Sequence, residues 1–115
     1  MSDPVDLDRL REFSDGTDEG LRALARLFLA DSDETVVELA GAVDRRAAAE
    51  IQFLAHRARG SVAACGAARL AEILLEMESL ALQGRAADAA SMMPSVEREL
   101  REVQTFVSAS LLSVG

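Results

Sequence analysis

The chain has 115 residues, 50% of them hydrophobic, with a net charge of -8 and an isoelectric point near 4.6. This length is typical of one domain, so a single domain is predicted over residues 1–115. An acidic chain lacks the concentrated Lys and Arg of a nucleic-acid binder, and no apolar run approaches the ~20 residues that span a bilayer. The start of the chain also lacks a secretory signal pattern, so we expect a cytoplasmic protein without nucleic-acid or membrane partners.

The first two predicted helices lie on either side of a short polar connection. Asp3 is expected to cap a short helix over residues 4–13, with proline at the first helical position. Thr17 is expected to cap a long helix over residues 18–44, because carboxylates follow it and apolar residues then recur at the helical period. The polar sequence DSDE at residues 31–34 is the point where that helix is most easily bent.

The remaining helices are expected over residues 46–64, 67–83 and 85–112, with Gly84 as the C-terminal cap of the middle one. Pro94 should either kink the last helix or mark its true start. Four Phe and no Trp or Tyr leave a core of small and aliphatic residues, which favours closely packed helices. The predicted fold is therefore all-α: an antiparallel up-down four-helix bundle with a short additional N-terminal helix.

The chain's single histidine, His56, is predicted to face solvent. On a helical wheel the apolar residues of its helix gather on the opposite side, within about 60° of it: Ala47, Ile51, Leu54, Ala58, Val62 and Cys65. Cys65 has no partner for a disulfide or a CxxC motif and is expected to be a small buried hydrophobe. His56 is then either a solvated surface residue or the centre of a site.

Gly60 lies four residues after His56 and shares its side of the helix. A glycine inside a helix costs about 1 kcal/mol relative to alanine, so its presence needs a physical reason. One reason is clearance for a group bound to His56, and the other is close approach of a neighbouring helix. Arg59, three residues after His56, can offer a fork of donors to an anion at the same place.

The sequence AHRARGSVAACG, which begins at Ala55, resembles the signature of histidine phosphotransfer (HPt) domains of bacterial multistep phosphorelays. That signature has Ala-His, a lysine and a glycine three and four positions after the histidine, and a second glycine ten positions after it. Here Arg59 replaces the lysine and Ala58 replaces a large aliphatic residue, while Gly60 and Gly66 match. The preceding long helix and the following ARLAEILLEME are also similar to the family, so the resemblance covers nearly the whole chain.

The resemblance implies a phosphocarrier that accepts a phosphoryl group on His56 from the aspartate of a response-regulator receiver domain and passes it to another receiver. Arg59 would contact phosphoryl oxygens, and Gly60 would provide clearance. The family has no autokinase activity and no nucleotide site, so the chain would be a phosphotransfer intermediate without a bound cofactor, and Mg²⁺ would come from the receiver. The expected partners are receiver domains and hybrid sensor kinases, and the expected state is a monomer.

A contact surface for these partners is expected around His56. It comprises Gln52, Phe53 and Ala63 on the same helix and Leu75, Glu78 and Leu82 on the next. Glu78 either hydrogen-bonds near His56 or is an ordinary surface carboxylate, and single exposed leucines need no function.

Two other classes of protein are alternatives, of which an adaptor is the main one and a sensor-kinase domain fits less well. A degenerate HPt fold could serve as a helical adaptor, with Arg59 and Ala58 as marks of lost transfer. A dimerisation-and-phosphoacceptor domain of a sensor kinase usually has an acidic residue directly after its histidine, whereas Arg57 follows here. A metal site is disfavoured because one histidine and one cysteine offer no clustered ligands.

Overall fold

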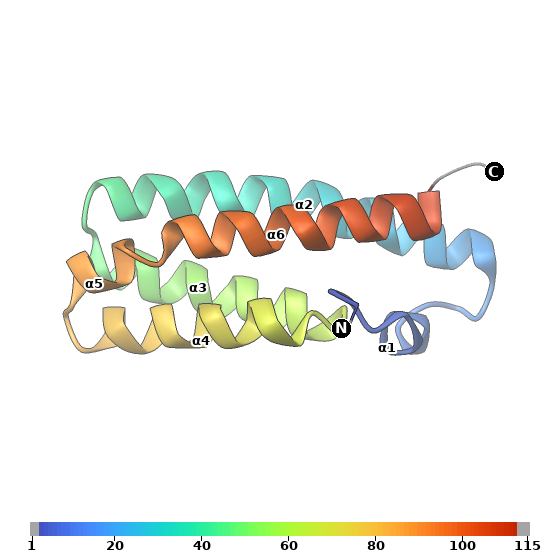
Figure 1. Cartoon of the computed structure of the whole chain (residues 1–115), viewed down its shortest axis with the longest axis horizontal. Coiled ribbons are helices and arrows are strands. Elements are labelled where there is room, and N and C mark those ends of the chain that lie inside the picture. The colour runs from blue at the N-terminus through green and yellow to red at the C-terminus, as the bar shows by residue number, and fades with distance from the viewer. Residues whose placement is uncertain (1–2, 113–115) are drawn as a thin grey trace.

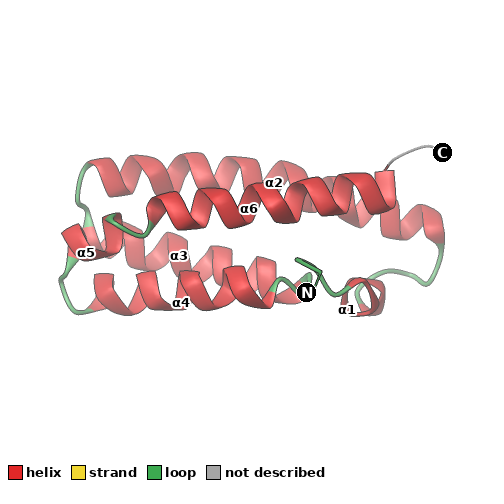
Figure 2. Cartoon of the chain, in the orientation of Figure 1, coloured by secondary structure: helices red, strands yellow, loops and turns green. Residues whose placement is uncertain are grey.

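The protein is an all-α bundle in which four long helices run up and down (Figures 1 and 2). The computed structural model describes residues 3–112. Its elements are α1 (Leu7–Glu12), α2 (Asp18–Asp44), α3 (Ala48–Ala64), α4 (Ala68–Leu82), α5 (Ala86–Ala90), α6 (Met93–Val107) and a π-helical turn η1 (Ser108–Leu112). Each long helix packs against the next, and α6 returns to α2, which closes the bundle and confirms the predicted architecture.

The first helix begins later than the sequence predicts. Its N-cap is Asp6, whose carboxylate accepts hydrogen bonds from the backbone N–H groups of Asp8 and Arg9, so the prediction of Asp3 as the cap was wrong. The backbone N–H of Asp6 donates to the carbonyl of Gly66 at 3.2 Å, and the neighbouring Val5 is buried. These long-range contacts hold the first residues against the turn between α3 and α4 and prevent the helix from starting earlier.

The long helix α2 has the predicted bounds and the predicted cap. The Thr17 side chain accepts a hydrogen bond from the backbone N–H of Gly20 at 2.9 Å. The helix continues without interruption through residues 31–34. There the amide of Gln104, on α6, donates to Ser32 and Asp33, so the polar sequence is a bridge between two helices.

The start of α3 and the division of the last predicted helix also differ from expectation. Arg46 has a φ of +54°, which a helix cannot contain, so α3 begins at Ala48 instead of at residue 46. The expected single helix over residues 85–112 is three elements, α5, α6 and η1. Pro94 lies in the first turn of α6, where its missing N–H leaves no hydrogen bond unmade, so it marks a helix start and not a kink.

The core runs the length of the bundle. Its largest fully buried side chains come from α1, α2, α3, α4 and α6, and they are Leu10, Leu39, Ile51, Leu70, Leu74, Met77, Val103 and Val107. Cys65 is also buried, as predicted, and burial raises the pKa of its thiol to about 11. The thiol is therefore protonated and unreactive near neutral pH.

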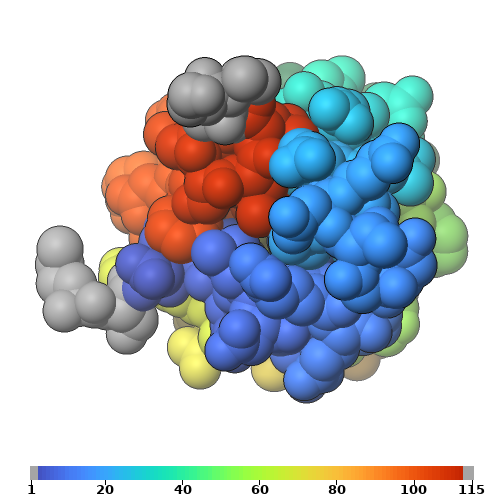
Figure 3. Space-filling view, turned by 90° about the vertical axis from the view of Figure 1, so that its right-hand side faces the viewer, coloured from blue at the N-terminus to red at the C-terminus, as the bar shows by residue number. Residues whose placement is uncertain are grey.

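The bundle has two layers of different length, one formed by α2 and α6 and the other by α3 and α4. In Figure 1, α2 and α6 extend to the right beyond α3 and α4, and α1 lies beneath this overhang. Figure 3 looks at that end of the molecule, where α1 and the first turns of α2 lie beside the last residues of α6. Across residues 3–112, none of the helices combines the length and apolar character needed to cross a bilayer.

Candidate functional site

His56 lies on the outer side of α3, away from the core. Its side chain is 62% exposed, whereas Leu54, Ala55 and Ala58 beside it on the helix are buried. The helical wheel correctly predicted the exposed side of His56 and the buried side opposite it, because α3 is an uninterrupted helix with one apolar side. The imidazole is therefore accessible to a partner molecule.

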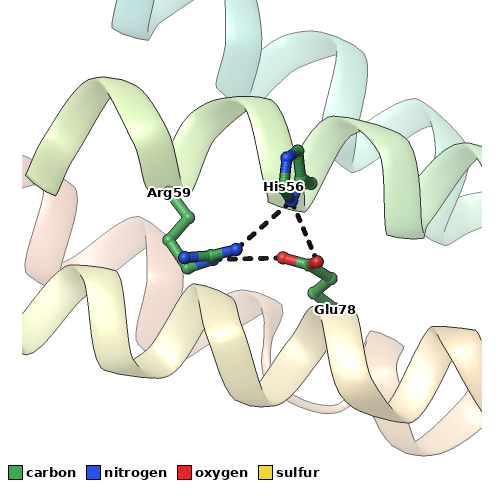
Figure 4. Close-up of polar contacts among 3 residues, drawn as sticks. All are labelled: His56, Arg59 and Glu78. Atoms are coloured by element: carbon green, nitrogen blue, oxygen red, sulfur yellow. Dashed lines mark hydrogen bonds and ion pairs between the residues drawn. The ribbon is translucent and has the colours of Figure 1, made fainter.

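Three side chains from two helices meet at this point (Figure 4). Glu78 reaches across from α4, and its Oε1 lies 3.0 Å from His56 Nδ1. Its other oxygen, Oε2, accepts a hydrogen bond from Arg59 Nε at 3.1 Å. Arg59 Nη2 also lies 3.2 Å from His56 Nδ1, so the three groups form a closed cluster.

Gly60 borders this cluster and faces open space. A Cβ built on Gly60 would meet nothing within 4 Å, and the residue is exposed. Among residues 3–112, no atom of another helix lies within 4 Å of that Cβ position, which argues against the close-packing explanation for a glycine inside α3. Clearance above the helix remains as its physical reason.

A family model described as the Hpt domain matches residues 23–106, which include all three residues of the cluster and Gly60. The chain belongs to the Hpt domain family. Along 100% of its length, and 100% of the other chain, it is similar in fold to the crystal structure of histidine-containing phosphotransfer protein B (HptB) from Pseudomonas aeruginosa PAO1, with a TM-score of 0.89 and 23% sequence identity. No curated protein matches the sequence significantly.

Glu78 is the least accessible member of the cluster in this HPt domain, with a side chain only 13% exposed. Burial raises the pKa of its carboxyl group. Hydrogen bonds from His56 and Arg59, together with their positive charges, lower the pKa by more than burial raises it, so the net pKa is below its usual value. The carboxylate is therefore ionised throughout the neutral range. Of the two alternatives left open by the sequence, Glu78 as a partner of His56 is the one observed.

Acid should weaken this cluster. Because the folded-state pKa of Glu78 is lowered, its stabilising contribution is complete above the unfolded value of about 4.3 and is lost as pH falls through the folded value. The free energies of unfolding of the wild type and Glu78→Gln should differ by about 0.5–1 kcal/mol at pH 5 and converge toward pH 3. Urea titrations at pH 5 and pH 3 would measure the difference in unfolding free energy, with Glu76→Gln, at an exposed glutamate on α4, as the control. A constant difference would contradict the assignment.

The other predicted contact residues surround the cluster. Phe53, Leu75 and Leu82 are exposed, and Gln52 and Ala63 are half-buried. Because α3 and α4 run antiparallel with Glu78 opposite His56, Leu82 lies one turn away on the side of Gln52, and Leu75 lies on the side of Gly60. The structure thus brings the predicted residues of both helices to one face.

A further part of this face comes from α2 and was missed by the sequence analysis. Exposed Val37 and Phe53 line one groove between α2 and α3. Arg57, next to His56, donates to the carboxylate of Glu38 at 3.4 Å beside this groove. A helical wheel for α2 places Val37 off the core stripe, but only the packing of α2 against α3 shows that it lies near Phe53. Within the described residues no cluster of three or more His, Cys, Asp or Glu side chains is placed to hold a metal ion.

Proposed function

We propose that this HPt domain is a phosphocarrier, in which His56 accepts a phosphoryl group from a receiver-domain aspartate and passes it to a second receiver. The observation that carries the proposal is an exposed histidine whose Nδ1 is engaged by Glu78 while the space beside it, above Gly60, is open. Figure 4 shows the other ring nitrogen directed away from both partners. This arrangement offers one nitrogen to an incoming group.

The cluster favours Nε2 as the nucleophile. A carboxylate only accepts hydrogen bonds, so the 3.0 Å contact with Glu78 is a hydrogen bond only when Nδ1 of neutral His56 carries the hydrogen, and the 3.2 Å contact of Nδ1 with Arg59 Nη2 is then between two donors. We assign the hydrogen bond to the shorter contact, because Arg59 is already paired with Glu78 through Nε. The other tautomer would set two acceptors against each other at this distance. With Nδ1 protonated, the lone pair lies on Nε2, away from Glu78, where a phosphoryl donor can reach it.

The transfer itself needs little covalent help from the protein. The Nε2 lone pair attacks phosphorus in line, the bond between phosphorus and the aspartate oxygen breaks, and the carboxylate leaves with its electron pair. The receiver's acidic pocket would supply Mg²⁺ for charge neutralisation. Positioning by α3 and α4 is then the contribution of this chain. Arg59, whose guanidinium lies 3.2 Å from Nδ1 of the imidazole, is the cation that would turn toward the new phosphoryl group.

The partner surface would be the face around His56. Phe53, Leu75 and Leu82 provide exposed apolar contacts on it, and Val37 extends it across α2. Exposed apolar side chains around a polar centre are typical of a protein interface. Receiver domains and hybrid sensor kinases are the partners that this surface would dock, one at a time, onto a monomer.

The arginine at position 59 does not by itself favour the adaptor alternative. All twelve basic residues of the chain are arginines, so the absence of lysine is a property of the whole sequence and not of the site. Arginine keeps the charge and adds a planar fork that can bind two phosphoryl oxygens. The cluster therefore retains the chemistry that a carrier needs.

Transfer from a receiver tests the proposal directly. The purified protein would be incubated with radiolabelled, phosphorylated receiver domain and Mg²⁺, and the label on this chain would be examined for stability. A phosphohistidine is labile in acid and stable in alkali, which distinguishes it from phosphoserine and from an acyl phosphate. Label with that profile is the expected result, and no label from a panel of receivers from the same cell would overturn the proposal.

A side chain at position 60 should hinder transfer without harming the fold. Gly60→Leu is expected to slow transfer from the receiver at least tenfold, because a displacement of about 1 Å in the reacting groups can cost up to 100-fold. Its stability should equal or exceed that of the wild type, since the added Cβ meets open space and leucine is a better helix former. Rapid-quench transfer assays and urea unfolding would measure both, with Ala23→Leu, an exposed site on α2, as the control. Transfer at the wild-type rate would show that clearance at Gly60 is unnecessary.

A further inference from the structure

The cation nearest to His56 is already bound by an anion of the same protein. Arg59 Nε donates to Glu78 Oε2 at 3.1 Å, and the Arg59 side chain is only 32% exposed. The family resemblance implies Arg59 as a contact for phosphoryl oxygens, whereas in the structure it reaches from α3 toward α4 with its guanidinium paired to Glu78 (Figure 4). Glu78 in turn uses one oxygen for each partner, Oε1 for His56 and Oε2 for Arg59.

Phosphorylation of His56 would place a second anion beside this pair. A phosphoryl group carries close to two negative charges at neutral pH and binds best to a bidentate arginine fork. The Arg59 fork that engages Glu78 through Nε is the same fork that would turn toward the phosphoryl oxygens. The Arg59 guanidinium cannot make well-aligned hydrogen bonds to the Glu78 carboxylate and to the phosphoryl group at the same time, so one contact weakens as the other forms.

We propose that Glu78 competes with the phosphoryl group for Arg59, so that it shortens the lifetime of phosphorylated His56 and favours onward transfer. The inference rests on the proposed phosphocarrier function. In the unphosphorylated state Glu78 gains from both contacts, since it accepts from Nδ1 of His56 and from Arg59. In the phosphorylated state the Arg59 contact is shared with the phosphoryl group. Glu78 thus stabilises the unphosphorylated protein relative to the phosphorylated one, which suits a carrier that must pass on the phosphoryl group that it accepts.

Glu78 is a positioning residue in this scheme, because it acts through Arg59. Glu78→Gln separates its charge from its hydrogen bond, since the amide oxygen of glutamine still accepts from Nδ1 while the anion that binds Arg59 is removed. Arg59→Ala removes the group for which the two anions compete. The pair of substitutions therefore distinguishes competition for Arg59 from direct repulsion between Glu78 and the phosphoryl group.

The four proteins of this cycle, namely the wild type, Glu78→Gln, Arg59→Ala and the double variant, would be phosphorylated with phosphoramidate. In that reaction the phosphorus–nitrogen bond of the donor breaks, a bond to His56 forms and ammonia leaves. After removal of the donor, phosphorus NMR would follow hydrolysis of the phosphohistidine at neutral pH. Glu78→Gln should lengthen the half-life roughly two- to tenfold, the range of a partly exposed charged contact. The same substitution in the Arg59→Ala background should change it little.

Equal half-lives for the wild type and Glu78→Gln would overturn the inference, and so would an equal lengthening in both backgrounds, which would indicate direct repulsion. Glu76→Gln is the matched control for the loss of one negative charge from α4, and thermal unfolding of each variant would confirm that the bundle is intact. Labelling by phosphoramidate without transfer from any receiver would overturn the proposed function and leave the comparison of half-lives valid. Failure of phosphoramidate to label His56 would overturn both.

Discussion

His56→Gln is expected to abolish phosphorylation of this HPt domain while leaving the bundle folded. The chain has one histidine, so no other imidazole can replace it. The side chain is 62% exposed and contributes nothing to the core, and a glutamine amide can still donate to Glu78 from this position. No label should pass from a phosphorylated receiver to the variant, and the free energy of unfolding of the variant should differ from that of the wild type by less than about 1 kcal/mol.

The same variant separates a carrier from an adaptor. Binding of a receiver domain, measured by calorimetry, should be retained because the surrounding apolar surface, including Phe53, Leu75 and Leu82, is unchanged. Signalling output in the cell should be lost if His56 carries the phosphoryl group. Retained output together with retained binding would establish the adaptor, and residual acid-labile label on the variant would place the phosphoryl group on another residue.

The sequence was sufficient for features that depend on local spacing. The bounds of α2 follow from the Thr17 cap and the apolar period, and the outward direction of His56 follows from the apolar side of α3. Gly60 could be placed on the solvent side for the same reason. Each of these features depends on one helix alone, so helical geometry was enough to predict it.

Features that depend on contacts between distant residues could not be predicted. The bond from Asp6 to Gly66 joins positions sixty residues apart and decides where α1 begins. The pairing of Glu78 with both His56 and Arg59 depends on how α3 and α4 are aligned along each other, which the turn at Gly66 sets. The sequence proposed Glu78 as a candidate neighbour of His56, but only the packed helices show that it also engages Arg59.

The second glycine of the HPt signature has a structural role, which is testable by comparison with another glycine. Gly66 and Gly84 each have a φ of +76°, in the left-handed region that disfavours alanine. A Cβ on Gly84 would meet nothing within 4 Å, whereas a Cβ on Gly66 would lie 2.6 Å from the Cβ of Asp6 and 2.9 Å from its backbone nitrogen. Alanine at position 66 must therefore displace Asp6 as well as strain the turn.

Gly66→Ala is expected to lower the free energy of unfolding by roughly 3 kcal/mol, and Gly84→Ala by about 1 kcal/mol. The smaller loss measures the cost of the backbone conformation, and the difference measures the displacement of Asp6, whose N–H donates to Gly66 and whose carboxylate caps α1. Urea unfolding of both variants gives the two values, and hydrogen exchange of the α1 amides in Gly66→Ala should show loss of protection there first. Equal losses for the two variants would mean that α1 moves aside at little cost and is only loosely attached to the bundle. Phosphorylation of His56 by phosphoramidate should persist in the folded fraction of Gly66→Ala, because Gly66 supports the end of α3 and does not contact the cluster.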